Sequence, residues 1–212
     1  MEKYIKKYSL LDRFHVSRET YLDFEKFILQ ILEKNNEINL ISKESEANIR
    51  FRHIVDCAQI IDFIDLNDNM CCDLGSGGGM PGIVIAIMMK NLNQSMKFNL
   101  YEKSHHKSLF LKDVSRKLNL NTEVIQKDIF KLSNLTSGTI MTRAFKPLPA
   151  VLELVYKNFN NYKNLILFMG KTGKQTLNEG FKEWDFEYKE KKSLTSEDSF
   201  LVNIRNIKKK IE

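Results

Sequence analysis

A short glycine-rich segment constrains the fold of this chain more than any other part of its sequence. Residues 73–82 read DLGSGGGMPG and join an apolar run that begins at Met70 to a second one that begins at Ile83. This position predicts a loop between a buried strand and a helix, where glycines permit positive φ and let a ligand approach the backbone closely. Four glycines within five residues are more than a plain tight turn requires. The segment therefore predicts a ligand-binding loop.

Two cofactor patterns compete for this loop. Gly75, Gly77 and Gly79 follow Asp73 as D-x-G-x-G-x-G, the arrangement that cradles the amino-acid part of S-adenosylmethionine. Gly77, Gly79 and Gly82 also match the dinucleotide pattern G-x-G-x-x-G, which is weak evidence alone. Asp73 favours the first pattern, because its carboxylate would repel a pyrophosphate but could hold the ammonium of S-adenosylmethionine, directly or through water.

An acidic residue is expected at the end of the next strand. Glu102 closes the segment of residues 97–102, and from there it is placed to accept hydrogen bonds from ribose hydroxyls. S-adenosylmethionine and a dinucleotide both carry such a ribose. Glu102 therefore supports a nucleoside-containing cofactor without choosing between the two.

From Met70 onward, short apolar runs alternate with amphipathic segments. Strands are expected at residues 70–74, 97–102, 122–126, 138–144 and 164–170, helices at 81–90, 105–120, 147–159 and 174–184, and a closing hairpin at 186–194 and 199–207. This repetition implies right-handed parallel crossovers with helices on both faces of the sheet. We predict an α/β, doubly wound, Rossmann-like class I methyltransferase fold. Its mostly parallel sheet ends in an antiparallel hairpin and is preceded by N-terminal helices.

The first seventy residues are expected to be helical. Tyr21, Phe24 and Phe27 begin an apolar stripe at three-residue spacing, and Ser17 is a candidate N-cap. A second helix is expected over residues 44–63. The chain has only three prolines and no linker-like stretch. We predict one domain over residues 1–212, in which a helical extension (1–68) packs on a cofactor-binding α/β core (69–212).

Composition and charge add a few limits. The formal net charge of +6 favours polyanionic partners, through electrostatic steering and counterion release. Cys57, Cys71 and Cys72 lack CxxC spacing, which argues against a disulfide framework or a zinc site, and we expect no bound metal. The N-terminal residues lack the apolar core of a signal peptide, and no stretch is long enough to span a membrane. We therefore expect a cytoplasmic protein without a membrane partner.

Several segments together resemble one family, the bacterial RNA methyltransferases called RsmG or GidB. The matching segments are residues 39–42 (NLIS), 52–56 (RHIVD), the glycine loop through Ile83, 142–145 (TRAF) and the pair 170–171 (GK). They stand in family order across nearly the whole chain. The family methylates N7 of a guanine in small-subunit (16S) ribosomal RNA. The resemblance thus implies an S-adenosylmethionine-dependent enzyme whose partner is 16S ribosomal RNA or the small ribosomal subunit. We expect it to act as a monomer.

The resemblance also implies cofactor contacts from the glycine loop, from Arg143 and from the loop after the third strand. That last loop departs from the family's more usual acidic pattern, so the side chain that frames the adenine is left open. Asp128 could bond the adenine amino group, or it could cap the short helix that it precedes. The predicted cofactor contacts are Asp73, Gly75, Gly77, Gly79, Met80, Glu102, Asp128, Ile129, Phe130 and Arg143.

N7 of guanine carries an in-plane lone pair and no proton, so methyl transfer needs no general base and depends mainly on positioning. The chain has no convincing Ser-His-Asp or Cys-His nucleophilic set, which suits such an acceptor. Arg143, at the end of an expected strand, is the predicted catalytic residue. It could contact the cofactor carboxylate or donate to guanine O6; a structural salt bridge is the alternative.

The RNA contacts are expected mostly at the carboxyl ends of the strands, where ligands bind in this fold class. His53 and Asp56 lie three apart on one helix and so share a face. Polar packing between helices would explain both, as would contact with the target base, whereas Arg52 is either an RNA contact or a solvated arginine. The predicted RNA contacts are Arg52, His53, Lys146, Lys171 and Lys174.

A second group of basic residues is expected to be a solvated helix face instead. It comprises Lys103, Lys107, Lys112, Arg116 and Lys117.

Two other functions remain open from the sequence. One is methyl transfer to a small molecule, whose binding should depend little on salt, whereas RNA binding should weaken steeply with salt. The other is a non-catalytic nucleotide-binding RNA module, which would bind the cofactor without turnover on any RNA.

Overall fold

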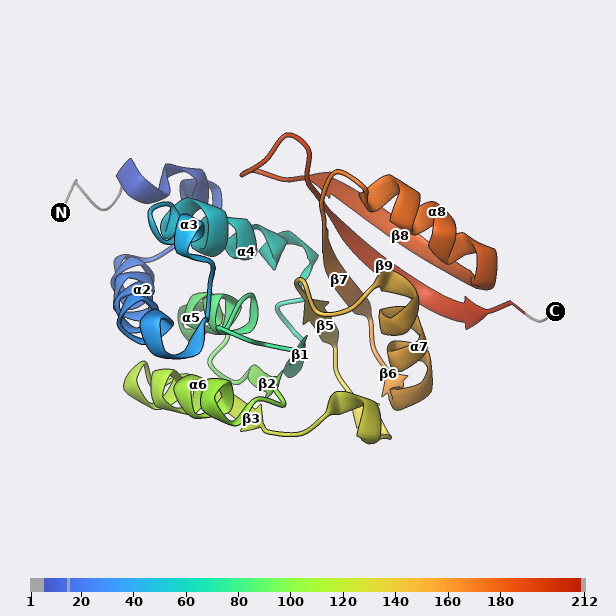
Figure 1. Ribbon diagram of the computed structural model, residues 1–212, viewed down its shortest axis with the longest axis horizontal. Helices are drawn as coiled ribbons and strands as arrows, with labels where there is room; N and C mark the ends of the chain where they lie inside the picture. Colours follow the sequence, from blue (N-terminus) through green and yellow to red (C-terminus); the bar gives the residue numbers. More distant parts are fainter. Residues whose placement is uncertain (1–5, 15, 211–212) are drawn as a thin grey trace.

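The computed structural model describes residues 6–14 and 16–210 of the chain. Residues 1–5, which belong to the N-terminal segment considered above as a possible signal peptide, lie outside the described residues. A seven-stranded sheet with the order β3-β2-β1-β5-β7-β9-β8 forms the centre of the molecule (Figure 1). Its strands are β1 (Met70–Leu74), β2 (Lys97–Tyr101), β3 (Thr122–Ile125), β5 (Thr139–Thr142), β7 (Asn164–Met169), β8 (Trp184–Lys192) and β9 (Phe200–Lys209).

The first five of these strands pair in parallel, and β9 runs antiparallel to both β7 and β8. This confirms the predicted doubly wound sheet with a terminal antiparallel hairpin. A second, two-stranded parallel sheet of β4 (Leu135–Thr136) and β6 (Phe159–Asn161) was not expected. Both of its strands are too short to give a periodic signal in the sequence.

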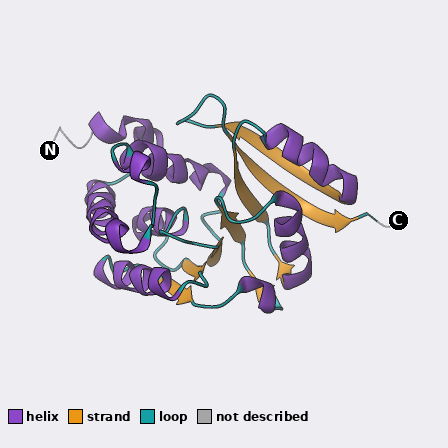
Figure 2. Ribbon diagram, in the orientation of Figure 1, coloured by secondary structure: helices purple, strands orange, loops and turns teal. Residues whose placement is uncertain are grey.

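Helices cover both faces of the large sheet (Figure 2). The N-terminal helices, α5 and α6 lie on one side and α7 and α8 on the other (Figure 1). The helices are η1 (Lys6–Phe14), α2 (Arg18–Ile38), α3 (Lys43–Glu46), η2 (Arg50–Val55), α4 (Asp56–Ala58), η3 (Gln59–Phe63), α5 (Gly82–Leu92), α6 (His105–Lys117), η4 (Ile129–Lys131), α7 (Leu148–Asn158) and α8 (Gly173–Glu183).

The apolar core has two parts, one on each face of the sheet. Within β1, Cys71 packs in the part that contains α2 and α5, and Cys72 packs in the part that contains α7. Parallel strands buried on both faces are mostly apolar, as β1 and β7 are, whereas the edge strand β3 is partly exposed. Because α2 and α5 share one core cluster, we keep the prediction that the extension and the α/β core belong to one domain.

The start of α2 agrees with the sequence, but the second expected helix does not. Ser17 accepts a hydrogen bond of 3.3 Å from the backbone N–H of Thr20, as an N-cap does. The single helix expected over residues 44–63 is wrong, because α3, η2, α4 and η3 succeed one another there. Within the π-helical segment η2, the carbonyl oxygen of Arg52 accepts a hydrogen bond of 2.9 Å from Nη2 of Arg143. This carbonyl group therefore has a partner outside the helix.

The segment after α2 is fixed by one buried amide. Oδ1 of Asn35 accepts hydrogen bonds from the backbone N–H groups of Leu40 (2.7 Å) and Ile41 (2.9 Å). The carbonyl oxygen of Leu40 lies only 3.0 Å from where a Cβ of Gly78 would be. The NLIS segment therefore rests directly on the glycine loop, and a side chain at position 78 would push the two apart.

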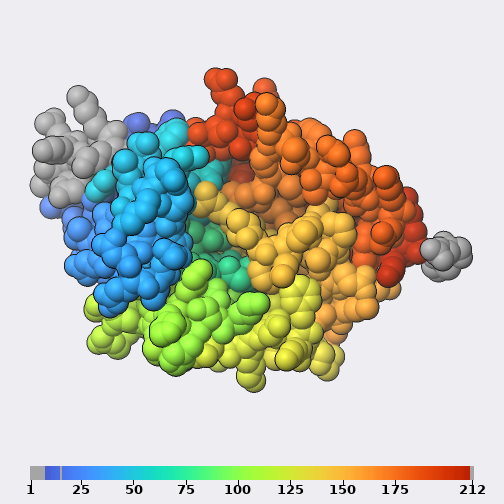
Figure 3. All heavy atoms as spheres, in the orientation of Figure 1, coloured from blue at the N-terminus to red at the C-terminus, as the bar shows by residue number. Residues whose placement is uncertain are grey.

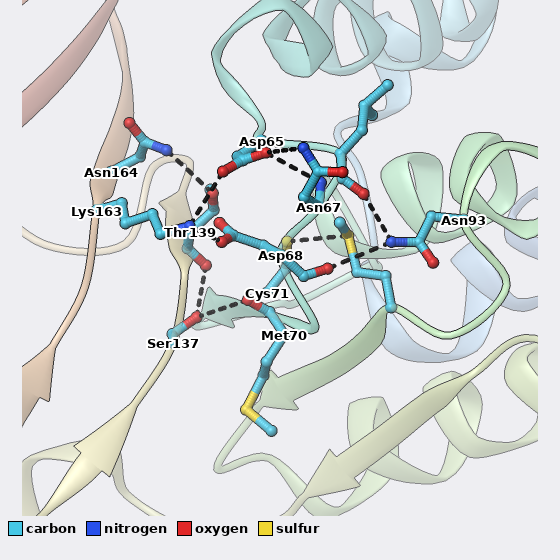
Figure 4. A network of polar contacts seen from close by, with 12 residues as sticks. Asp65, Asn67, Asp68, Met70, Cys71, Asn93, Ser137, Thr139, Lys163 and Asn164 are labelled. Atoms are coloured by element: carbon cyan, nitrogen blue, oxygen red, sulfur yellow. Dashed lines mark hydrogen bonds and ion pairs between the residues drawn. The ribbon is translucent and has the colours of Figure 1, made fainter.

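Polar contacts tie the opposite end of the sheet, where β1, β5 and β7 begin (Figure 4). Lys163 forms ion pairs with Asp65 and with the buried Asp68. A Cβ on Gly138 would lie 2.2 Å from Oδ2 of Asp68, so a side chain there would displace the carboxylate of Asp68. This network holds the amino ends of the strands together, and it lies at the end of the sheet away from the glycine loop.

Candidate functional site

A cavity of about 740 Å³ opens at the carboxyl ends of β1, β2, β3 and β5. Figure 3 shows it as a hollow between the N-terminal helices, α6 and the segment that follows β5. It lies where the chain order of the sheet reverses next to β1, the usual ligand site of doubly wound folds. Its lining residues are Leu40, Ile41, His53, Gly75, Ser76, Gly77, Gly78, Met80, Tyr101, Glu102, Lys103, Lys107, Lys127, Asp128, Ile129, Phe130, Arg143, Ala144, Phe145, Lys146 and Ala150.

The glycines of the loop divide into two groups. Gly75, Gly77 and Gly78 line the cavity. A Cβ on Gly77 would have only the carbonyl oxygen of Gly75 near it, at 3.7 Å, so the space above this residue is open to a ligand. Gly79 and Gly82 are absent from the lining; a Cβ on Gly79 would meet Ile83 at 2.7 Å. Of the glycines predicted to touch the cofactor, Gly79 is thus placed to pack the loop on α5.

Asp73 lies behind the loop and is buried. Its Oδ2 accepts hydrogen bonds from Oγ of Ser76 (2.7 Å) and the backbone N–H of Gly82 (2.9 Å), so it fastens both ends of the loop. Oδ1 is buried without a hydrogen-bond partner among the described residues. Burial raises the pKa of Asp73 to about 6, and the nearby charge of Glu102 acts in the same direction.

Glu102 stands at the end of β2, as expected, and its carboxylate faces the cavity. Oε2 accepts a hydrogen bond of 2.9 Å from the backbone N–H of Gly77, and Oε1 accepts one of 2.7 Å from Ser104. A carboxylate has about four acceptor positions, so it can accept further hydrogen bonds from a ligand.

The loop after β3 forms a third wall of the cavity. Oδ1 of Asp128 accepts a hydrogen bond of 3.2 Å from the backbone N–H of Phe130, so Asp128 caps η4. Ile129 is buried, whereas the ring of Phe130 is 43% exposed. Phe130 stacks on Phe145 with ring centroids 5.9 Å apart. Phe145 in turn lies on the glycine loop, because a Cβ on Gly75 would be 2.2 Å from its Cδ2.

Arg143 enters the cavity from the end of β5 and is held by the N-terminal helices. Nη2 pairs with Oδ2 of Asp56 at 3.0 Å and also donates to the carbonyl oxygen of Arg52. Nη1 lies 3.0 Å from Nδ1 of His53. The next residue, Ala144, has φ of +51°, a conformation that costs non-glycine residues energy and often occurs at functional sites. The ion pair between Arg143 and Asp56 is the salt bridge expected as the alternative to a catalytic role, and it lies at the cavity wall.

The contacts of His53 define its protonation. A guanidinium can only donate, so Nδ1 of His53 must accept the hydrogen bond from Arg143. The proton of the neutral ring is then on Nε2, which lies 2.8 Å from Oγ of Ser45 and donates to it. Burial and the positive charges of Arg143 and Arg52 lower the pKa of His53 to about 4. The imidazole is therefore neutral at physiological pH.

Comparison with known families decides what class of protein carries this site. The family model described as "rRNA small subunit methyltransferase G", or GidB, matches residues 20–205. This chain belongs to that family. The protein of that name from Pelagibacter ubique (strain HTCC1062) is 61% identical over 212 residues, covering 99% of this chain and 100% of that protein. The one from Ruegeria pomeroyi (strain ATCC 700808 / DSM 15171 / DSS-3) is 30% identical over 193 residues, covering 91% of this chain and 94% of that protein.

Solved structures agree on the fold. A SAM dependent methyltransferase from Aquifex aeolicus matches 71% of this chain and 89% of its own with a TM-score of 0.54 and 14% identity. A SAM-dependent O-methyltransferase from Thermotoga maritima matches 87% of this chain and 73% of its own with a TM-score of 0.52 and 11% identity. The class I methyltransferase fold is confirmed. The GidB family assignment likewise confirms a methyltransferase with S-adenosylmethionine as its cofactor.

The lysines around the GidB site differ in part from those expected. Lys146 lines the cavity, as predicted. Lys171 is exposed outside the lining, and Lys174 forms an ion pair with Glu190 of β8. Arg52 is exposed and also outside the lining.

Sequence reasoning missed three lysines of the cavity wall. Lys103 and Lys107, expected on a solvated face, line the cavity because they occupy the β2–α6 junction and the first turn of α6. Lys127, in the loop after β3, lines it as well. Their position directly after two strand ends was the signal that could have identified them.

Within residues 6–14 and 16–210, no helix is long and apolar enough to cross a bilayer. Over the same residues, no group of three or more His, Cys, Asp or Glu side chains is arranged to hold a metal ion.

Proposed function

We propose that this GidB family member transfers the methyl group of S-adenosylmethionine to N7 of a guanine in 16S ribosomal RNA. The observation that carries the proposal is the set of residues that line the cavity at the carboxyl ends of the strands. The open glycine loop and the carboxylate of Glu102 line one side of the cavity. The cations that line it are Arg143 and the four lysines Lys103, Lys107, Lys127 and Lys146. This combination suits a nucleoside cofactor beside a polyanionic acceptor. The relatives named above bear the name of an enzyme of the small-subunit ribosomal RNA.

The residues present fit the cofactor. The open space over Gly77 leaves room for its amino-acid part, and Glu102 is placed to accept hydrogen bonds from its ribose. Asp73 lies outside the cavity lining, so its unpartnered Oδ1 would reach the ammonium only through a water molecule. Ile129 and Phe130 would flank the adenine, with Asp128 at its edge. When bound, S-adenosylmethionine supplies a methyl group made electrophilic by its sulfonium.

Methyl transfer to guanine N7 requires little from the protein beyond positioning of the base and the cofactor. N7 attacks with its own lone pair, and no proton has to be removed. A neutral His53 that donates to Ser45 is consistent with this, since it is neither a free base nor an acid at physiological pH. We propose that Arg143 is the residue that acts at the reacting centre. Its guanidinium has five N–H donors, and the contacts to Asp56, to the carbonyl oxygen of Arg52, to His53 and to Sγ of Cys57 leave the Nε–H for the cofactor carboxylate or guanine O6.

The lysines are proposed to meet the RNA backbone. Lys103, Lys127 and Lys146 lie on three different loops around the cavity, and Lys107 lies in the first turn of α6. A guanine in an exposed loop, or one turned out of its stack, would reach the cavity between them. Outside the cavity, the RNA contacts that we propose are Arg52, Lys171 and Lys174. At the cavity itself, His53 is a further proposed contact. We further propose that the protein acts in the cytoplasm as a monomer, which sedimentation velocity would test.

The decisive experiment is mapping of N7-methylguanine. Small subunits and naked 16S ribosomal RNA from cells that lack this protein are incubated with the purified enzyme and S-adenosylmethionine. We expect one guanine to become methylated at N7, detected by strand cleavage at N7-methylguanine. Methylation of a small molecule with no transfer to either RNA substrate would overturn the proposal. Cofactor binding without transfer to any acceptor would do so as well, in favour of a non-catalytic module.

A further inference from the structure

A carboxylate outside the cavity joins the site to a distant turn. Oδ2 of Asp56 pairs with Nη2 of Arg143 at 3.0 Å. Its other oxygen, Oδ1, accepts a hydrogen bond of 2.6 Å from Oγ1 of Thr195, one of 2.9 Å from Nε2 of Gln59 and a longer one of 3.4 Å from Oγ of Ser193. Thr195 lies in the turn between β8 and β9, at residues 193–199. Asp56 is absent from the cavity lining, yet it lies between that turn and Arg143.

The turn is docked on α4 and η3 by a small set of specific contacts. Gln59 is fully buried; its Oε1 accepts a hydrogen bond of 2.8 Å from the backbone N–H of Leu194. Oγ of Ser193 lies 3.0 Å from Oγ1 of Thr195 and accepts a hydrogen bond of 3.1 Å from the backbone N–H of Thr195. The hydroxyl of Thr195 is thus held in place before it reaches Asp56. Its position is fixed by the hairpin, not by the cavity.

Asp56 needs this support to face Arg143 in one orientation. A carboxylate can rotate about its Cβ–Cγ bond, and either oxygen can meet a guanidinium. With Oδ1 fixed by Thr195 and Gln59, only Oδ2 is presented to Nη2 of Arg143. Nη1 is then directed at Nδ1 of His53. The two partners together fix the plane of the guanidinium at the cavity wall.

We propose that Asp56 and Thr195 are positioning residues for Arg143, so that the β8–β9 turn is part of the catalytic machinery. The inference deepens the proposed function and rests on it for the role of Arg143. It also assigns a task to a segment that contributes no lining residue. Hydrogen bonds to charged groups are the stronger and more directional ones, which suits the alignment of a planar donor.

The test compares two substitutions at one position with a matched control. Thr195→Val keeps the shape and removes the hydroxyl, and Thr195→Ser keeps the hydroxyl. Asp62→Asn is the control, because Asp62 pairs with Lys191 across the same helix–hairpin contact at 2.5 Å without touching Asp56. Calorimetry measures the affinity for S-adenosylmethionine, a methyl-transfer assay measures kcat and KM, and ¹⁵N NMR reports the tautomer of His53.

We expect Thr195→Val to lower kcat/KM on RNA by about tenfold, the effect of losing one hydrogen bond to a charged group. Cofactor affinity should fall with it, and the imidazole signals of His53 should shift because Arg143 no longer holds Nδ1. Thr195→Ser should restore all three, and Asp62→Asn should change none. Asp56→Asn, whose amide cannot replace the charge, should lower kcat/KM by more than Thr195→Val does.

Two results would overturn the proposal. One is a Thr195→Val protein that melts at a lower temperature but keeps wild-type cofactor affinity, kcat/KM and His53 signals. The other is an Asp62→Asn protein with losses equal to those of Thr195→Val, which would assign the effect to general docking of the hairpin. Failure of the proposed function is distinguishable, because the cofactor affinity and the NMR signals need no RNA.

Discussion

Glu102 and Gly77 are joined directly, by a hydrogen bond of 2.9 Å from the backbone N–H of Gly77 to Oε2 of the carboxylate. The end of β2 and the glycine loop that follows β1 are therefore one unit. The carboxylate proposed to hold the ribose also sets the backbone on which the amino-acid part of the cofactor rests. A change at either residue should act on binding through the other.

Gly77→Ala is expected to weaken the cofactor affinity at least tenfold while the protein stays folded. The new Cβ meets no nearer atom than the carbonyl oxygen of Gly75, but it fills the open space above the loop. The φ of +56° adds a cost of about 1 kcal/mol to the free energy of folding. Calorimetry with S-adenosylmethionine and urea unfolding separate the two effects.

Gly82→Ala provides the contrast, because this Cβ would lie 2.6 Å from both Oδ2 of Asp73 and Cδ2 of Leu100. It should lower the free energy of unfolding by about 2 kcal/mol, as overpacking in a core does. If Gly77→Ala destabilised the fold as much and bound the cofactor normally, the loop would be structural only.

The glycine pattern predicted the loop but not the direction in which each glycine faces. Gly79 and Gly82 both fit a cofactor pattern, yet both pack inward. Gly78, outside both patterns, lies in the lining against the carbonyl oxygen of Leu40. A glycine pattern in a sequence indicates positions where the fold or a ligand leaves no room for a side chain. It does not record whether a ligand or the protein itself takes the space.

Phe130→Ala is expected to weaken S-adenosylmethionine binding by about tenfold and leave stability within about 0.5 kcal/mol. The ring is 43% exposed, so its loss removes little from the core. Stacking of a base on an aromatic side chain contributes about 1–3 kcal/mol. Calorimetry with the cofactor and with free methionine provides the check, since methionine lacks the adenine and should bind the two proteins equally. Unchanged cofactor affinity would remove Phe130 from the adenine site.

The strands and most helices followed from periodicity, whereas the Arg143 cluster did not. Each strand of the large sheet overlaps its expected range, because the inner strands β1 and β7 are mostly apolar runs and the two strands of the terminal hairpin alternate apolar and polar residues. His53 and Asp56 were seen to share a helix face, but their common partner is 87 or more positions further along the chain. Arg143, directly after β5, meets them only in the folded structure. Contacts of this kind leave no local signal in a single sequence.

Asp73→Asn is expected to remove part of the dependence of stability on pH. With a pKa of about 6 in the folded protein and an ordinary value near 3.8 when unfolded, Asp73 takes up a proton in the folded state first as pH falls. The free energy of unfolding of the wild type should therefore rise from pH 7 to pH 4 relative to that of Asp73→Asn, by about 2–3 kcal/mol. Urea unfolding at several pH values measures this, and parallel curves would mean an ordinary pKa for Asp73.

The lysines that line the cavity differ in their surroundings from the basic residues in the last turns of α6. Lys103, Lys107 and Lys127 line the cavity. On the same helix as Lys107, Arg116 and Lys117 pair instead with Asp113 and lie outside the lining. The cavity wall thus offers a test set of three lysines, and the last half of α6 offers a control set with the same charge.

Changing Lys103, Lys107 and Lys127 to Gln should weaken RNA binding and flatten its dependence on salt. Each phosphate contact that is removed lowers the slope of log affinity against log salt concentration by about 0.7–0.9, so the triple variant should lose about 2. Cofactor affinity should change far less, because these lysines are proposed to meet phosphates of the RNA and not the cofactor. Glutamines at Lys112, Arg116 and Lys117 remove the same formal charge and should leave the slope nearly unchanged. Filter binding of a 16S ribosomal RNA fragment across a salt series gives both slopes. A control variant that flattens the slope, beside a test variant that does not, would place the RNA on the outer face of α6 and away from the cavity.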